Sequence, residues 1–193
     1  GVAGGWQDQY AAVFGGFNFI EFHPDENIVS PIRLHSKIAL ELEESLLLCD
    51  TGIGHHSGNI HDDQKETMSS SAVKDMVKLN VELTYKSRNY LLKGELEKFG
   101  ECLGKAWELK RNFSSMISNT YIDEIYNGAL NHGAVGGKLL GAGGGGFFML
   151  YCFWGIVEEI ESYNDAKSFH TSIKSGELTA LPPTDANKDE VPF

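Results

Sequence analysis

The sequence predicts an α+β fold, with short strands near both ends of the chain and a helical region between them. Residues 17–22 are aromatic and partly alternating, which is typical of a strand. Residues 46–49 and 147–154 are two further apolar runs of strand length. From about residue 64 to residue 133, apolar side chains recur at spacings of three and four, which indicates helices.

The first elements follow from local signals. Residues 7–15 suit a short helix that the Gly15-Gly16 pair would stop. Residues 23–27 have turn chemistry, so we expect the next apolar run, residues 28–34, to pair back on residues 17–22 as a hairpin. The strand at residues 46–49 leads into Asp50-Thr51-Gly52, a loop of the kind that often carries function.

Three helices are expected in the middle of the chain, with apolar stripes that begin at Val73, Leu92 and Ile122. Asn119 or Thr120 is the expected N-cap of the third helix, and Gly133 is expected just beyond its end. The simplest interpretation of these stripes is core packing. A weakly patterned helix is expected at about residues 156–169, followed by a polar, loosely held tail.

Composition narrows the class of protein. The 193 residues are 41% hydrophobic and 11% aromatic, as in an ordinary globular protein of one or two domains. No apolar run is long enough to span a membrane, and no signal peptide is visible. The net charge of −11 argues against nucleic acid as a partner, whereas a small anionic ligand is compatible with it.

The three cysteines, Cys49, Cys102 and Cys152, are isolated from one another in the sequence. This pattern argues against a disulfide framework or a zinc ribbon and favours a reducing, cytoplasmic setting. The chain begins at Gly1 without an initiator methionine, which favours the interpretation that upstream sequence precedes it.

The most informative segment is the glycine run Gly141-Ala142-Gly143-Gly144-Gly145-Gly146, expected between the end of a helix and the start of a strand. Without a Cβ, such a backbone can adopt positive φ and approach another surface closely. Apolar residues on both sides indicate a loop held between core elements. Phosphate contact is the favoured interpretation, then tight helix–strand packing, then a hinge. The run lacks the Gly-Lys-Ser/Thr ending of a P-loop and the acidic partner of a dinucleotide motif.

A second candidate is Asp8, which follows a glycine pair at the expected start of the first helix. The pattern alone favours a first-turn carboxylate that interacts with the helix dipole over a general base or an orienting residue.

A third candidate is the group His55, His56, His61, Asp62 and Asp63. No zinc-finger or HExxH spacing is present, so a solvated loop is favoured, sugar or phosphate contact comes next, and a structural metal comes last.

Together these segments resemble the GHMP kinases. Residues 136–147 are similar to the third sequence motif of that family. Residues 4–22, which begin Gly-Gly-Trp-Gln-Asp-Gln, resemble the D-glycero-D-manno-heptose 7-phosphate kinases, and the fucose kinases share the shorter Gly-Trp-Gln-Asp-Gln. Residues 48–52, 99–110 and 122–126 also resemble the heptose branch. The resemblance extends from residue 1 to about residue 152.

The resemblance implies an α+β two-domain kinase, here with a remnant of an S5-like N-terminal catalytic domain (residues 1–35) and a ferredoxin-like C-terminal domain with a helical hairpin (36–170). A polar tail (171–193) is expected after them. It implies transfer of the γ-phosphoryl group of ATP, with Mg²⁺, to the anomeric hydroxyl of D-glycero-D-manno-heptose 7-phosphate. The product, a 1,7-bisphosphate, belongs to nucleotide-heptose biosynthesis. A fucose kinase-like sugar kinase and a non-catalytic fragment or interaction module are the alternatives. A homo-oligomer is compatible with these expectations.

The resemblance also implies roles for individual residues. Asp8 matches the acidic residue that acts on the sugar hydroxyl as base or orienter, and no residue is assigned to a metal. Trp6 stands where many heptose-phosphate kinases have lysine. In this respect the chain resembles the fucose kinases instead. The nucleotide side is assigned to Gly141, Ala142, Gly143, Gly144, Gly145 and Gly146, and the sugar side to Trp6, Gln7, Thr51, Gly52 and Ser57.

The sequence departs from the family pattern in four ways. The first motif is absent, and so is the Pro-x-x-x-Gly-Leu-x-Ser-Ser loop that wraps the phosphates. The upstream acidic magnesium ligand is missing too, and the segment after Cys152 does not resemble the usual family ending. The chain therefore resembles the C-terminal half of a kinase with a fragment of the catalytic domain at its front.

Overall fold

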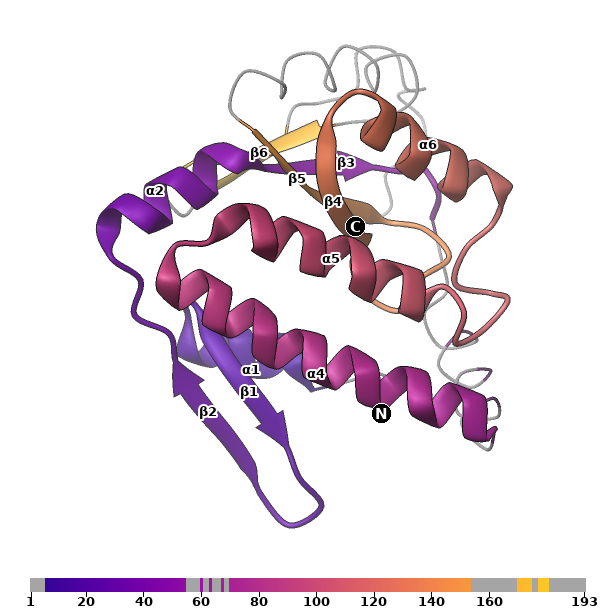
Figure 1. Cartoon of the computed structure of the whole chain (residues 1–193), viewed down its shortest axis with the longest axis horizontal. Helices are drawn as coiled ribbons and strands as arrows, with labels where there is room; N and C mark the ends of the chain where they lie inside the picture. Colours follow the sequence, from indigo (N-terminus) through magenta and orange to yellow (C-terminus); the bar gives the residue numbers. More distant parts are fainter. Residues whose placement is uncertain are drawn as a thin grey trace, which may run out of the picture.

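The computed structural model describes residues 6–54, 60, 63, 67 and 70–153, together with the backbone of residues 170–174 and 177–180. A two-stranded hairpin stands apart from a five-stranded antiparallel sheet of order β4-β5-β3-β6-β7 (Figure 1). The α+β class is confirmed. The elements are α1 Gln7–Phe14, β1 Asn18–Phe22, β2 Asn27–Pro31, α2 Ser36–Ser45, β3 Leu46–Asp50, α4 Ser71–Lys93, α5 Leu96–Lys110, α6 Thr120–Asn131, β4 Ala134–Leu139, β5 Phe147–Cys152, β6 His170–Lys174 and β7 Glu177–Ala180.

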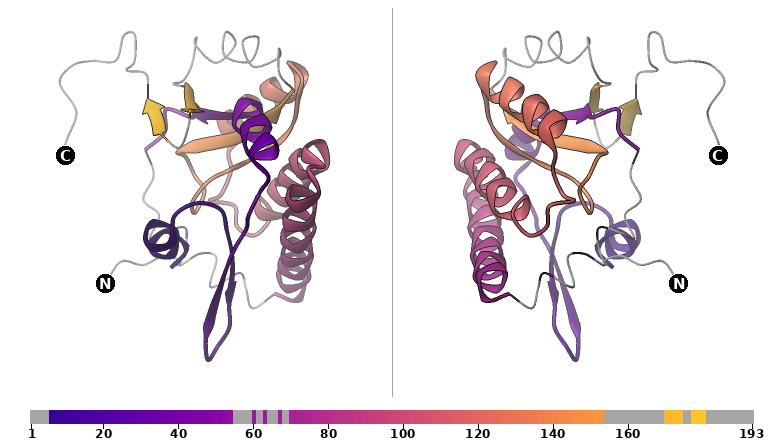
Figure 2. Two further views of the ribbon diagram at one scale, coloured as in Figure 1. Left: turned by 90° about the vertical axis from the view of Figure 1, so that its left-hand side faces the viewer. Right: turned by 90° about the vertical axis from the view of Figure 1, so that its right-hand side faces the viewer.

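The N-terminal elements match the sequence prediction. Helix α1 stops before Gly15, whose φ is 62°, and β1 pairs with β2 as the expected hairpin. Figure 2 shows this hairpin projecting away from the five-stranded sheet. Helix α4 supports it, because the Arg88 guanidinium lies 4.5 Å from the centre of the Phe19 ring and the Tyr85 hydroxyl donates to Glu21. Helix α1 has no buried residue, and Val13 is 80% exposed.

The three middle helices are confirmed. Gly94 ends α4 in the left-handed conformation, with φ 71°, so α5 turns back beside α4 as a helical hairpin (Figure 1). The Asn119 side chain caps α6 by accepting a hydrogen bond from the backbone N–H of Ile122. The core lies between α5, α6 and the sheet. There the fully buried Trp107 ring packs edge-on against the Phe148 ring, with 5.3 Å between the ring centres.

Helix α5 approaches the sheet so closely that only glycine fits at the contact. A Cβ on Gly136 of β4 would lie 2.3 Å from the carbonyl oxygen of Gly100 on α5. A Cβ on Gly100 would in turn lie 2.5 Å from the Tyr151 ring. These glycines therefore fix how near α5 lies to β4, and so where the end of α5 meets the loop that follows β4.

The sequence analysis did not predict helix α2, which runs directly into β3. Its segment is rich in glutamate, and Leu42 is its one fully buried large apolar side chain, so its periodicity is weak. The helix begins at His35, whose Nδ1 accepts a hydrogen bond from the backbone N–H of Lys37.

Strand β4 was not predicted either, and it corrects the expected setting of the glycine run. The run joins β4 to β5, two antiparallel neighbours, rather than a helix to a strand. The expectation failed because Gly136 and Gly137 hide the strand pattern of β4. At its far end β5 stops at Cys152, before the expected residue 154.

Two further strands lie where a polar tail was expected. Strand β6 pairs with β3, with Leu47 opposite Ser172, and β7 pairs with β6. The expected helix at residues 156–169 and the remainder of the tail lie outside the described residues. Among the helices that the structure describes, none is both long and apolar enough to cross a membrane.

Candidate functional site

The glycine loop, residues 140–146, connects β4 to β5 and depends on glycine for its backbone conformation. Gly141, Gly143, Gly144 and Gly146 have φ values of 65°, 122°, 76° and 90°. Side chains other than glycine rarely adopt this region. The loop is closed at its base by a hydrogen bond from the Leu140 N–H to the Phe147 carbonyl, 2.8 Å long.

Two neighbouring segments hold the loop by backbone hydrogen bonds. Gly144 N–H donates to the Ile117 carbonyl at 2.8 Å, and Gly146 N–H donates to the Ile53 carbonyl at 3.1 Å. The Thr51 N–H returns a bond to the Gly146 carbonyl at 2.8 Å. A Cβ on Gly145 would lie 2.4 Å from the Ile53 oxygen. Tight packing, the second interpretation from sequence, therefore describes this part of the loop.

Two other loop amides are not bonded within the described part of the chain. In the described part of the chain, the N–H groups of Gly143 and Gly145 have no hydrogen-bond acceptor, although both residues are buried. Buried N–H groups are almost always paired in proteins. Since consecutive amides in positive-φ turns can form an anion-binding concavity, the phosphate interpretation stays compatible with this geometry.

Lys110, the last residue of α5, binds the base of the glycine loop. Its Nζ lies 3.1 Å from the Leu139 carbonyl oxygen and 2.5 Å from the Gly141 carbonyl oxygen. Burial, and secondarily the charge of Lys138, lower the pKa of Lys110 to about 7. Burial also lowers the pKa of Lys138. Lys110 was not recognised as a site residue from the sequence, although it ends residues 99–110, a segment that carries part of the family resemblance.

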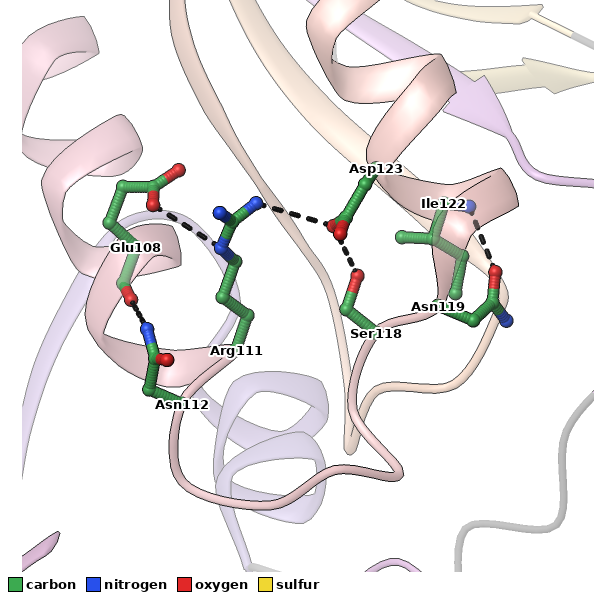
Figure 3. Close-up of polar contacts among 7 residues, drawn as sticks. All are labelled: Glu108, Arg111, Asn112, Ser118, Asn119, Ile122 and Asp123. Atoms are coloured by element: carbon green, nitrogen blue, oxygen red, sulfur yellow. Dashed lines mark hydrogen bonds and ion pairs between the residues drawn. The ribbon is translucent and has the colours of Figure 1, made fainter.

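A polar network fixes the segment between α5 and α6 that carries Ile117 (Figure 3). The Arg111 guanidinium pairs with Glu108 at 3.2 Å and with Asp123 at 3.3 Å. Asp123 also accepts a hydrogen bond from the Ser118 hydroxyl at 2.6 Å. Ser118 is the neighbour of Ile117, so this network positions the carbonyl that binds Gly144.

The predicted sugar-side residues in the loop after β3 lie beside the glycine loop. Thr51 is 1% exposed, and its hydroxyl oxygen accepts a bond from the Ile53 N–H at 3.4 Å. Gly52 is exposed, with φ 68°, and its N–H donates to the Asp50 carboxylate at 3.0 Å. Thr51 therefore contacts the loop through its backbone, and Gly52 is the more accessible of the two to a ligand. Ser57 lies outside the described residues.

Trp6, Gln7 and Asp8 lie together at the start of α1, where all three are exposed. Among the described residues, no hydrogen bond, ion pair or ring contact joins α1 to the glycine loop. The position of Asp8 in the first helical turn agrees with the dipole interpretation. Its catalytic role stays a prediction.

The histidine cluster lies largely outside the described residues. Asp63 is described, and its carboxylate accepts a hydrogen bond from the Ser114 hydroxyl. Across the described residues, no group of three or more His, Cys, Asp or Glu side chains could hold a metal ion.

The lowered lysine pKa values predict a pH dependence of stability. In the unfolded chain Lys110 has the ordinary pKa of 10.5, so between pH 7 and 10.5 the unfolded state binds a proton that the folded state has lost. The free energy of unfolding should therefore rise with pH across this window. Urea denaturation between about pH 7 and pH 9 should show a shallower rise for Lys110→Met than for the unchanged chain. Parallel curves would contradict the assignment.

Comparison with known proteins identifies the family. Residues 87–169, which include α5, α6, the glycine loop and both lysines, match the family model "GHMP kinases C terminal". This part of the chain is therefore similar to the C-terminal domain of the GHMP kinases. This match confirms the resemblance stated from the sequence.

The chain is also similar to named sugar kinases. It is 34% identical over 169 residues to the D-glycero-alpha-D-manno-heptose 7-phosphate kinase of Campylobacter jejuni, an overlap of 87% of this chain and 48% of the relative. It is 29% identical over 159 residues to the bifunctional fucokinase/GDP-fucose pyrophosphorylase of Arabidopsis thaliana, covering 78% of this chain and 15% of the relative.

The chain is also similar in structure to a sugar kinase of known crystal structure. The D-glycero-D-manno-heptose 1-phosphate kinase of Bacteroides thetaiotaomicron superposes with a TM-score of 0.62 at 28% identity, covering 89% of this chain and 46% of that chain. The chain thus spans about half, or less, of the length of these relatives.

Proposed function

We propose that this chain is the C-terminal part of an ATP-dependent sugar kinase. The kinase phosphorylates the anomeric hydroxyl of D-glycero-D-manno-heptose 7-phosphate and forms the 1,7-bisphosphate. The observation that carries this proposal is the 34% identity to the Campylobacter heptose 7-phosphate kinase across 87% of the chain. The glycine loop supports it, because two of its buried amides have no acceptor among the described residues.

In the proposed reaction the anomeric oxygen attacks the γ-phosphorus of ATP. The bond from that phosphorus to the oxygen that bridges it to the β-phosphorus breaks, and ADP leaves. Asp8 takes the hydroxyl proton or aims the hydroxyl, and the loop amides of Gly143 and Gly145 bind phosphate oxygens. Positioning and charge neutralisation supply most of the acceleration in such transfers. Gly52 and the side chains of Trp6 and Gln7 face the sugar in this proposal.

Magnesium belongs to the proposal through the family alone, because the described residues hold no suitable cluster of ligands. When bound, it would neutralise charge on the phosphates. A cytoplasmic setting is likewise proposed, supported by the spacing of the three cysteines, which are isolated from one another in the sequence.

A fucose kinase-like activity is the second candidate. Two observations favour it: Trp6 stands where many heptose-phosphate kinases have lysine, and the chain is 29% identical to the Arabidopsis fucokinase over 159 residues. This match covers less of the chain than the Campylobacter match does.

The test is release of ADP from Mg-ATP with D-glycero-D-manno-heptose 7-phosphate or fucose as the acceptor. We expect release that requires the heptose phosphate and is lost in Asp8→Asn. Fucose-dependent release would favour the second candidate. If a folded sample is inactive with both sugars, the chain by itself is a non-catalytic fragment.

A further inference from the structure

We propose that Lys110 is a positioning residue for the glycine loop: its side-chain nitrogen holds the carbonyls of Leu139 and Gly141, so that the loop amides are presented in a fixed arrangement. We call this pair of hydrogen bonds the Lys110 clamp. Its link to nucleotide binding rests on the proposed function. The clamp itself is a property of the described structure and can be tested without a substrate.

The clamp joins elements that are far apart in the sequence. Lys110 ends α5, and its two acceptors lie 29 and 31 residues later in the chain, on either side of Leu140. The N–H of Leu140 itself closes the loop base by binding the Phe147 carbonyl. Lys110 therefore fixes the point at which β4 ends and the positive-φ backbone begins.

The chemistry of the group suits this position. An ammonium has three N–H donors, and a neutral amine still has two, which equals the number of carbonyls that Lys110 binds. The clamp can therefore persist whether or not the nitrogen carries a proton. A long, flexible stem also suits this position, because Lys110 is the last residue of α5 and its acceptors lie at the end of β4 and in the glycine loop.

In the described part of the chain, the nearby charged groups do not compete with the two carbonyls for the Lys110 nitrogen. Lys138 on β4 faces it with the same charge. On the same helix, Glu108 and Arg111 pair with each other, and Arg111 turns to Asp123 of α6 (Figure 3). In the described part of the chain, no carboxylate forms an ion pair with Lys110. Among the described residues, the carbonyls of Leu139 and Gly141 are thus its polar partners.

The test compares Lys110→Met, Lys110→Arg and Lys138→Met in the 193-residue chain. Lys110→Met keeps an apolar stem and removes the donors, Lys110→Arg restores donors, and Lys138→Met is the matched control. The primary measurement is amide hydrogen exchange of Gly144 and Gly146 by NMR, with α6 amides as the reference for global stability. The second is the affinity for the ATP analogue AMP-PNP.

We expect about tenfold faster exchange of Gly144 and Gly146 in Lys110→Met, since the loss of two hydrogen bonds should allow local opening. The α6 amides and Lys138→Met should change little, and Lys110→Arg should recover much of the protection. Equal acceleration in the loop and α6, or none in the loop, would overturn the clamp. If Lys110→Met does not fold, faster loop exchange in Lys138→Met than in Lys110→Arg would overturn the clamp as well.

The AMP-PNP measurement separates the clamp from the proposed function. A weaker affinity in Lys110→Met with rescue by arginine supports both. If the unchanged chain does not bind AMP-PNP but the exchange pattern is as expected, the clamp stands and the nucleotide role fails. If all variants bind AMP-PNP equally while loop exchange changes, the clamp stands without a role in binding the nucleotide.

Discussion

Replacing Asp8 with Asn is expected to lower kinase turnover by about 10²- to 10⁴-fold, the usual contribution of a general base, with little change in the affinity for ATP. The acceptor hydroxyl must lose its proton as it attacks the γ-phosphorus. Asparagine can accept a hydrogen bond and aim the hydroxyl, but it cannot take up the proton. The measurement is steady-state ADP release with D-glycero-D-manno-heptose 7-phosphate at saturating Mg-ATP.

The matched control for this variant is Asp25→Asn. Asp25 is also exposed, but it lies in the turn between β1 and β2 rather than on α1. It should retain the turnover of the unchanged enzyme. A loss in Asp8→Asn that is equal for turnover and for ATP affinity would count against the catalytic role and favour the helix-dipole interpretation.

Replacing Gly145 with Ala is expected to lower the free energy of unfolding by about 1–3 kcal/mol, the usual effect of overpacking. The added methyl group would lie 2.4 Å from the Ile53 carbonyl oxygen, which is itself held by the Gly146 N–H. A backbone oxygen cannot rotate away as a side chain can. Either the loop or the segment after β3 must therefore move.

Gly54→Ala is the control, because a Cβ there would meet no atom within 4 Å. Neither Gly145 nor Gly54 has a positive φ, so backbone strain does not contribute to the comparison. Urea unfolding should separate the two variants. If both variants are as stable as the unchanged chain, the loop is less tightly held than the hydrogen bonds of Gly144 and Gly146 indicate.

Most helices and strands could be predicted from local pattern. The turn at residues 23–27 and the Asn119 cap each act within a few residues, and the structure confirms the elements that they delimit. Helix α2 could not be predicted in this way, because one deeply buried leucine among glutamates gives almost no periodicity. Strand β4 could not be predicted because its glycines interrupt the strand pattern. The close contact with α5 is what requires glycine there.

The residues of the candidate site also fall into two groups, those that the sequence indicated and those that it did not. The sequence indicated the glycine run and its neighbours Thr51 and Gly52, and the structure places these segments in contact. It did not indicate Lys110, because a lysine in the last turn of a helix is ordinary in any sequence. The predicted roles of Asp8, Trp6 and Gln7 stay predictions, since α1 makes no described contact with the glycine loop.

By itself, the sequence determined the α+β class, the family resemblance and the position of a loop that requires glycine. These depend on neighbouring residues and on a short motif. Only the tertiary structure decided that the loop joins two strands, that Ile53 and Ile117 bind its amides, and that Lys110 binds its carbonyls. The physical reason is that these partners are about 25 to 90 positions away along the chain, and hydrogen bonds over such separations exist only after the sheet and helices have packed.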